Sequence, residues 1–293
     1  MRFPVVALLV TSLVAPALVG GVSGCGSRKE PSAKSPTGPV TAKLAVAPPL
    51  VTPGERMTYR LSLRDLELGV YAITVGEITD VDGTPTIVVQ SHAKSVGLAS
   101  MVTKVDDYFT SWIDVATGRS RRFEAVENVR EDGAEKEHVT VQLAARAGQL
   151  VPLTHHLDDG PATTEQQQVS FADVWDYNAF LVALRAWEGA PGAKITVEVF
   201  RSRYLWRIEM VLGEKGTLVT ELGELPVLRF DAHSVKLDRA GNKYPNTDER
   251  DFSLWISDDD GRVPLKTEAK SDYGTIKMEI VDYQPGTGQR LRE

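Results

Sequence analysis

The stretch Phe252-Ser-Leu-Trp-Ile-Ser-Asp-Asp-Asp-Gly-Arg-Val-Pro-Leu-Lys266 has the pattern of a strand, a tight polar turn and a second strand. An upstream stretch, Phe109-Thr-Ser-Trp-Ile-Asp-Val-Ala-Thr-Gly-Arg-Ser-Arg-Arg-Phe123, repeats its aromatic residue, its Trp-Ile pair and its Gly-Arg pair at a constant spacing. β-Branched and aromatic residues favour a half-buried pleated surface, and glycine supplies the positive φ that a hairpin turn often needs. The repeat therefore predicts one hairpin unit used in both halves of the chain.

Four residues of this unit are predicted to be structural, namely Trp112, Gly118, Trp255 and Gly261. A buried Trp→Ala change costs roughly 3–5 kcal/mol, against a total stability of about 5–15 kcal/mol. We therefore expect each tryptophan to stabilise the fold before it does anything else.

The composition is that of an ordinary globular protein, with 293 residues, 42% hydrophobic and 25% charged. The formal net charge of −7 argues against a nucleic-acid binder, because such proteins neutralise phosphates with Lys and Arg. The densest basic group is Arg119, Arg121 and Arg122, which we interpret as a solvated strand face. No nucleic-acid partner is expected.

Residues 1–24 have the layout of a secretion signal, with one charge at Arg2 and an uncharged stretch that follows it. The segment Val22-Ser-Gly24 before Cys25 resembles the lipobox of bacterial lipoproteins. That resemblance implies cleavage before Cys25, diacylglycerol on its thiol and a membrane anchor made of acyl chains. Gly26 follows where many inner-membrane lipoproteins carry Asp, so the resemblance favours the outer membrane, facing the periplasm. The alternative is a plain transmembrane anchor.

Composition also divides the remainder of the chain. Residues 25–49 are rich in Ser, Pro, Lys and Ala, which predicts a flexible tether, and residues 285–293 are predicted to be a disordered tail. Cys25 is the single cysteine, so with its thiol acylated no disulfide can form. The domain 50–284 must then be stabilised by its hydrophobic core.

Alternation of apolar and polar residues predicts about a dozen strands within 50–284, arranged as two similar halves. The period changes to that of an amphipathic helix at 171–188, with Ser170 as N-cap and Gly189 and Pro191 as the stop. Residues 149–169 are polar without a clear period and are expected to form an exposed loop. The prediction is a mainly β domain: one curved antiparallel sheet or half-open barrel with a single α-helix packed on it.

Four motifs, in this order along the chain, resemble those of a known family: Thr52-Pro-Gly-Glu-Arg-Met-Thr-Tyr59, Tyr108-Phe-Thr-Ser-Trp-Ile-Asp114, Leu222-Gly-Glu-Leu-Pro226 and Arg262-Val-Pro-Leu-Lys266. Together they resemble the bacterial exported family called domain of unknown function 3108. The Trp-Ile-Asp turn is also similar to the half-barrel of Lol-type lipoprotein carriers. Neither resemblance brings catalytic residues with it, and the segment 154–169 matches neither pattern.

Chemical motifs are sparse. The chain has no Gly-x-Ser-x-Gly, P-loop or His-Glu-x-x-His motif, so we expect no catalytic residues, no metal and no cofactor. The pair His155-His156 beside Asp158-Asp159 is interpreted as a solvated polar loop, and Asp258-Asp-Asp-Gly261 as a hairpin turn. His92, His138 and His233 lie in or beside predicted strands and are expected to satisfy local hydrogen bonds.

Two functions remain open, and an uncharacterised hydrolase is a distant third. In the first, an apolar pocket lined by Trp112, Trp206 and Trp255 binds or carries a lipid or another hydrophobic ligand in the cell envelope. In the second, side chains fill the interior, and the outer face of a structural or assembly lipoprotein binds an envelope protein. Inward strand residues have the same pattern in both cases, so the sequence leaves the two alternatives open.

Overall fold

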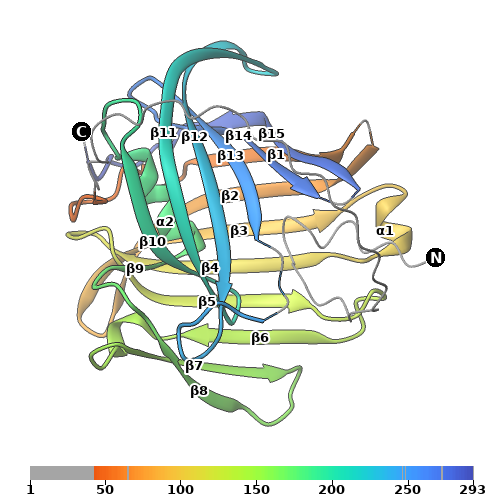
Figure 1. Cartoon of the computed structure of the whole chain (residues 1–293), viewed down its shortest axis with the longest axis vertical. Coiled ribbons are helices and arrows are strands. Elements are labelled where there is room, and N and C mark those ends of the chain that lie inside the picture. The colour runs from red at the N-terminus through yellow and green to blue at the C-terminus, as the bar shows by residue number, and fades with distance from the viewer. Residues whose placement is uncertain (1–42, 65, 246, 248, 272, 293) are drawn as a thin grey trace, which may run out of the picture.

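Two β-meanders meet along the strand pair β1 (Arg56–Leu63) and β15 (Gly274–Gln284) (Figure 1). The structure is a computed structural model that describes residues 43–64, 66–245, 247, 249–271 and 273–292. Within these residues all strands belong to one sheet of 15, in the order β8-β7-β6-β5-β4-β3-β2-β1-β15-β14-β13-β12-β11-β10-β9. Neighbouring strands are antiparallel except β9 and β10, so the predicted mainly β fold with one curved antiparallel sheet is confirmed.

The remaining elements follow in chain order. The first meander continues with β2 (Leu66–Val81), β3 (Thr84–Ser95), the one-turn helix α1 (Ala99–Val102), β4 (Asp106–Asp114), β5 (Ser120–Asn128), β6 (Lys136–Val141), the 3-10 turn η2 (Leu143–Ala145), β7 (Leu150–Leu157) and β8 (Thr163–Gln168). Then come β9 (Val174–Asp176), the helix α2 (Tyr177–Arg185), β10 (Lys194–Arg201), β11 (Tyr204–Thr220), β12 (Gly223–Leu237), β13 (Arg250–Ser257) and β14 (Pro264–Ser271).

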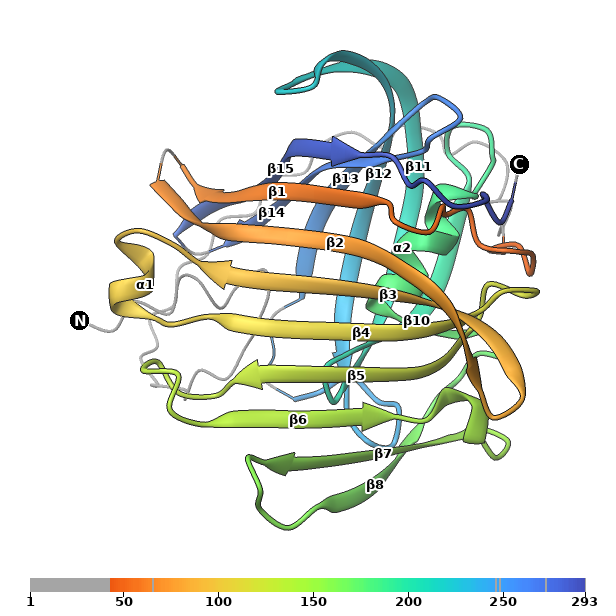
Figure 2. The ribbon, with the colours of Figure 1, turned by 180° about the vertical axis from the view of Figure 1, so that it is seen from behind.

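The sheet curls over on itself, so that β10–β13 cross in front of β2–β6 in Figure 1 and behind them in Figure 2. The curl does not close into a barrel, because β8 and β9 stand at the two ends of the strand order. Side chains on the inner face form the core, and Tyr59, Ile87, Phe123 and Phe230 are among those with no measurable exposure.

Each half bends its sheet at the same two places. The pairing of β2 with β3 slips after Val75, and the pairing of β11 with β12 slips after Leu212. The hairpins β4–β5 and β13–β14 slip directly after Trp112 and Trp255. Such bulges bend a strand and increase its twist, so equal positions of the bulges give the two halves the same curvature. The bulge in the second half leaves residues 204–220 as one long strand, β11.

The predicted helix 171–188 is shorter and begins later. Residues 174–176 pair with β10 as β9, and Asp176 is the N-cap, accepting a hydrogen bond from the Ala179 N–H at 2.9 Å. The hydroxyl of Ser111 also donates to Asp176, at 2.7 Å. Ser170, the predicted N-cap, instead donates its N–H to the Glu198 carboxylate. Residues 174–176, which have helical spacing in the sequence, therefore form a strand instead. The helix follows them and ends at Arg185.

Helix α2 lies inside the curl, between the two layers of the sheet, and is not laid on its outside (Figure 2). Its Asn178 amide donates to the main-chain oxygens of Val89 and Phe109 in the first half. Its Arg185 forms a buried ion pair with Glu55 at 2.7 Å and also donates to the Gly261 oxygen in the second half. The helix thus joins the two halves and fills one end of the interior.

The predicted loop 149–169 is wrong, because most of it forms the strands β7 and β8. The inner face of β8 is polar, which removes the apolar alternation that would have indicated a strand. Gln167 on this face is fully buried, donates to the Asp238 oxygen at 2.7 Å and accepts from Arg239 at 3.0 Å. Polar partners across the interior therefore replace apolar packing.

Both ends of the described chain pack on the domain. The Ala47 N–H donates to the Thr117 oxygen, and Leu44 is buried, so the last residues of the predicted tether 25–49 dock on the first tryptophan hairpin. The predicted disordered tail 285–293 instead follows the segment before β1, where Gly288 donates to Pro53 and Leu291 to Val51. The predicted signal peptide 1–24 and Cys25 lie outside the described residues. No helix among those described is long and apolar enough to cross a bilayer.

Candidate functional site

Trp112 and Trp255 occupy equivalent places on the outer face of the sheet. Each precedes an isoleucine that is fully buried on the inner face, so the alternation of a strand turns the tryptophan outward. Arg122 lies 5.0 Å from the centre of the Trp112 ring. Arg229 and Lys266 each lie 5.3 Å from the centre of the Trp255 ring. Both tryptophans are half-buried beneath cations, which adds a cation–π attraction to their packing.

The residue with a positive φ stands at different positions in the two hairpin turns. Gly118 has a φ of 71°, and a Cβ there would lie 2.6 Å from the Ala47 oxygen, so the docked segment also requires glycine. In the second turn the positive φ of 47° belongs to Arg262 and not to the predicted Gly261. Asp259 accepts from the N–H groups of both residues and closes this turn. The second turn is one residue longer, which shifts the left-handed position past the glycine.

Trp206 lies on the opposite face of the sheet. It pairs across the strands with Val199 and Lys236, and its side chain is buried in the interior. The three tryptophans predicted to line one apolar pocket therefore point to different faces of the sheet. The two most deeply buried tryptophans are not among these three: Trp175 lies in β9, and the ring centre of Trp187 is 5.5 Å from that of Phe230.

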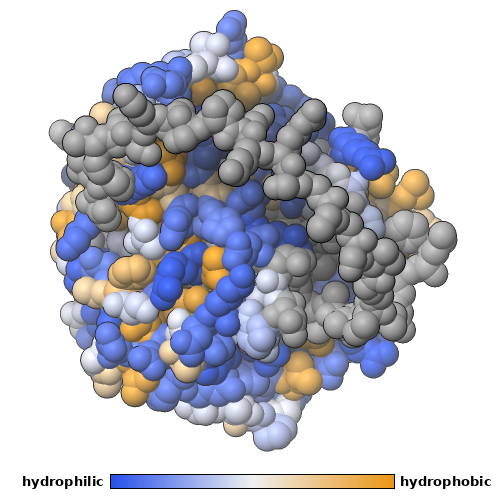
Figure 3. Space-filling view, in the orientation of Figure 1, coloured by the Kyte–Doolittle hydropathy of each residue, from blue (hydrophilic) through white to orange (hydrophobic). Residues whose placement is uncertain are grey.

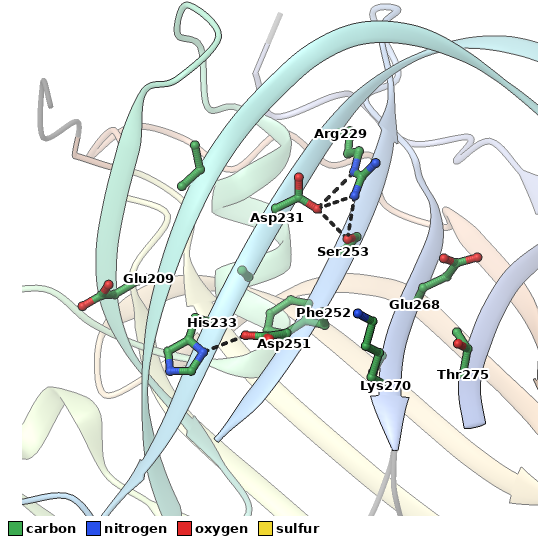
Figure 4. A pocket seen from close by; sticks show the side chains of 13 residues that line it. Glu209, Arg229, Asp231, His233, Asp251, Phe252, Ser253, Glu268, Lys270 and Thr275 are labelled. Carbon is green, nitrogen blue, oxygen red and sulfur yellow. Dashed lines mark hydrogen bonds and ion pairs between the residues drawn. The ribbon is translucent and has the colours of Figure 1, made fainter. Parts of the chain in front are cut away.

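A groove of about 500 Å³ runs over the outer face of β11–β15 (Figure 4). Four carboxylates line the groove, those of Glu209, Asp231, Asp251 and Glu268. Two permanent cations, Arg229 and Lys270, and the imidazole of His233 complete its charged and titratable lining. Hydrophilic side chains lie over the middle of this face of the molecule (Figure 3). The strands beneath the groove are already paired on both sides, so a ligand there meets side chains and not free main-chain groups.

Ion pairs hold the groove side chains in place (Figure 4). Asp231 accepts from Arg229 at 2.8 Å and from the Ser253 hydroxyl at 2.6 Å. His233 lies 2.7 Å from Asp251 and 3.1 Å from Glu249, and the hydrogen bond with Asp251 raises the pKa of the imidazole above its usual value. The groove is therefore a pre-arranged polar surface with an excess of negative charge.

The corresponding face of the first half carries fewer charges. Strand register pairs Val88 with Trp112, Gln90 with Thr110 and His92 with Tyr108, whereas it pairs Arg229 with Trp255, Asp231 with Ser253 and His233 with Asp251. On the next strand Arg122, Glu124 and Val126 correspond to Lys266, Glu268 and Lys270. Five of these nine positions keep their chemical character between the halves. The other four, Arg229, Asp231, Asp251 and Lys270, are charged only in the second half.

Inside the curl, cations of β10–β12 and their turns face carboxylates of β4–β8. Arg203 contacts Glu137 at 3.2 Å, and Arg239 donates to Glu165 at 2.7 Å. Burial raises the pKa of Asp107 to about 7 and that of Glu127 to about 6. Burial also lowers the pKa of Lys236 to about 8, and its ammonium lies 3.2 Å from the Tyr204 ring centre. These groups join the two layers, and no periodic pattern of residues indicates them.

The histidines do not converge on a metal site. His155 turns inward, 3.7 Å from both Glu137 and Glu165, whereas His156 stacks on His138 on the outer face. Neighbours in a strand point to opposite faces, so the pair cannot chelate one ion. Among the described residues no group of three or more His, Cys, Asp or Glu could hold a metal. His92 stacks on Tyr108 and bonds to Asp106.

Comparison with known proteins gives a family and a fold. The family model for proteins of unknown function DUF3108 matches residues 57–281. The crystal structure of a β-barrel-like protein of the domain of unknown function DUF1849 from Brucella abortus is 10% identical, with a TM-score of 0.54, covering 81% of this chain and 99% of that one. The two chains therefore share a fold.

Two further solved structures have lower TM-scores. A candidate lipoprotein from Parabacteroides distasonis is 7% identical with a TM-score of 0.37, covering 83% of this chain and 100% of that one. A candidate exported protein with a YmcC-like fold from Bacteroides fragilis is 9% identical with a TM-score of 0.30, covering 82% of this chain and 99% of that one. No curated protein shows significant sequence similarity to this chain.

Proposed function

This chain belongs to the DUF3108 family of proteins of unknown function, and from its outer groove we propose that it is a non-catalytic cell-envelope lipoprotein that binds a partner protein. The observation that carries the proposal is the difference between the outer faces of the two halves. The bulges and the inner isoleucines Ile113 and Ile256 repeat, but Arg229, Asp231, Asp251 and Lys270 replace neutral side chains around the groove. Exposed charges in fixed ion pairs do little for stability, so recognition is the better reason for them.

The groove favours an extended segment that carries Lys or Arg side chains. Its four carboxylates exceed its two permanent cations, and a volume of about 500 Å³ suits several side chains of a peptide. The ion pairs are formed before the partner arrives, which lowers the ordering cost of binding. Opposite charges on the partner would steer its approach and fix its register.

The apolar-ligand function finds less support. It needs Trp112, Trp206 and Trp255 on one wall, but the first and third face outward and the second inward. The void between α2 and the inner face, lined by Met57, Ile73 and Val182 among others, is only about 10 Å³. That volume is too small for an acyl chain.

The membrane anchor supports the same function. A lipobox-like segment before Cys25 implies acyl chains on that thiol, and Gly26 favours the outer membrane. An anchored domain searches for its partner within a thin layer at the membrane, which raises the effective concentration. Mass spectrometry of membrane-extracted protein should find the chain beginning at an acylated Cys25, and an intact Met1 or a free Cys25 thiol would contradict the anchor.

Site-specific photo-crosslinking in living cells tests partner binding. A photoreactive amino acid replaces Ser253 on the groove floor or, as the matched control, Thr110 at the same register position of the first half. We expect one discrete adduct from position 253 that disappears when Asp231→Lys and Glu268→Lys are added, and none from position 110. Equal adducts from both positions, or an adduct that survives the charge reversal, would contradict the proposal.

A further inference from the structure

We propose that the α1 end of the sheet rests on a lipid bilayer, with Leu98, Met101 and Val102 inserted among the lipids. The inference rests on the proposed lipid anchor at Cys25 but not on the partner groove. It assigns a contact surface to a helix of which only Ala99 belongs to the core.

The side chains of α1 point to solvent although they are apolar. Leu98 is 70% exposed, Met101 82% and Val102 51%, whereas Ala99 alone is buried and holds the turn to the domain. Gly97, with a φ of 53°, reverses the chain, and the Ser100 hydroxyl donates to its oxygen at 2.7 Å. The short helix is thus held in a defined conformation, and its exposed residues Leu98, Met101 and Val102 are called the apolar knob below.

The neighbouring turns extend this apolar surface. The Val96 N–H donates to Leu68 after the β1–β2 turn, and the Lys104 N–H donates to Glu131 in the β5–β6 turn, so three turns lie side by side. Four other turns at this end of the sheet also expose a large apolar side chain: Leu66, Val129, Leu157 and Tyr273. Figure 2 shows these turns at the same end of the sheet as α1.

Charge makes a bilayer the fitting occupant. Residues 95–103 carry no charge, and lysines stand on both sides of them, at Lys94 and Lys104. Apolar side chains between lysines suit a membrane surface, where the chains enter the hydrocarbon boundary and the ammonium groups meet anionic headgroups.

The tether permits this orientation. Residues 26–42 separate Cys25 from the described chain, and a segment of this length can span up to about 60 Å. The first described residues dock beside Thr117, at the end of the sheet opposite α1. A strand of 12 residues such as β3 is about 40 Å long. The anchor can therefore reach the membrane from either end, and the exposed apolar knob decides which end faces it.

The test uses the exported form, residues 25–293, with Cys25→Ser so that no acyl chain contributes to binding. Cys25 is the single cysteine, so Met101→Cys then gives a unique site for an environment-sensitive fluorophore. The control is Ile78→Cys, on an exposed side chain near the far end of β2. With vesicles of phosphatidylethanolamine and phosphatidylglycerol, we expect a blue shift of the label at position 101 and no shift at position 78.

A second pair of variants keeps the result independent of labelling. In the same background, Leu98→Asp with Met101→Asp should weaken vesicle binding roughly tenfold or more, because two apolar side chains are lost from the lipid. Ile78→Asp should leave the binding unchanged, and thermal melts should show that both variants fold. Equal shifts at the two labelled positions, equal vesicle binding of the two variants, or a dimer that dissociates on Met101→Asp without any vesicle binding would overturn the proposal.

Discussion

The tryptophan hairpins of the two halves have the same strand register and the same inner isoleucine, but their outer surfaces differ. Both slip their register directly after the tryptophan, both place an isoleucine on the inner face, and both cover the outer ring with a cation. Their outer neighbours differ, since Val88 and Gln90 stand beside the first hairpin where Arg229 and Asp231 stand beside the second. Packing therefore determines what the halves have in common, and the two halves differ on the surface that is free of that demand.

The largest expected effect concerns the shared frame. Ile113→Ala and Ile256→Ala each remove a fully buried side chain from the inner face and should cost roughly 2–5 kcal/mol. Because the two isoleucines take the same register position, beside Ile87 and Leu228, the two losses should agree within about 1 kcal/mol. Urea unfolding followed by circular dichroism measures both. A large loss from one variant and none from the other would show that the halves are not equivalent in the core.

The inner faces differ at several positions, and at one of them Asp107 in β4 takes the register position that Arg250 takes in β13. Burial raises the pKa of Asp107 to about 7, so between about pH 4 and 7 the native state keeps a proton that the unfolded chain has lost. Stability should therefore fall as the pH rises through this window.

Asp107→Asn should remove much of that pH dependence and stabilise the protein at pH 8 by roughly 2 kcal/mol. Thermal melts from pH 4 to 8 provide the measurement, and Asp106→Asn, a half-exposed neighbour, is the control. An unchanged pH profile in the Asp107 variant would show that this carboxyl does not carry the effect.

The tryptophans themselves should contribute less than the sequence suggests. Trp112→Ala and Trp255→Ala should each cost roughly 1–2 kcal/mol, because the rings are half-buried on the outer face and lose only part of their packing and their cation contacts. Trp255 has two cations and Trp112 one, so its loss should be the larger. Denaturant melts that gave the roughly 3–5 kcal/mol of a fully buried tryptophan would place the rings in the core.

The smallest effect belongs to the groove. Asp251→Asn removes the partner that raises the pKa of His233, so that pKa should fall toward its usual value. The protonated imidazole stabilises the native state below its pKa and loses this contribution as the pH rises through it. For an exposed pair the loss should be only about 0.5 kcal/mol. An NMR titration of the His233 ring checks the pKa, with His92 as the internal control.

Residue patterns predicted the frame well and the polar interior badly. Alternation in segments such as 194–200 follows from one apolar face, and it survives in the structure as β10. The alternation fails for β8, where Gln167 faces Arg239, and for Asp176, which leaves the helical pattern to cap α2. A buried polar side chain is stabilised by a partner distant in sequence, and periodicity contains no information about that partner.

The groove could not be predicted for a related reason. Its charges come from β11–β15 and lie far apart in the sequence, so only the register of the strands brings Asp231 beside Ser253 and His233 beside Asp251. The repeat of the hairpin was visible from the residues, but the face of each tryptophan was not, because either face satisfies the same alternation. The structure supplies the missing direction.

The most direct test of the account moves the surface of the first half onto the second. A variant with Arg229→Val, Asp231→Gln, Asp251→Tyr and Lys270→Val carries at these four positions the residues that the first half has at the same register. Photo-crosslinking from position 253 in this variant is the measurement. We expect a folded protein, with a melting temperature near that of the parent, that no longer forms the adduct. An adduct of undiminished yield would show that the charged groove is not what the partner recognises.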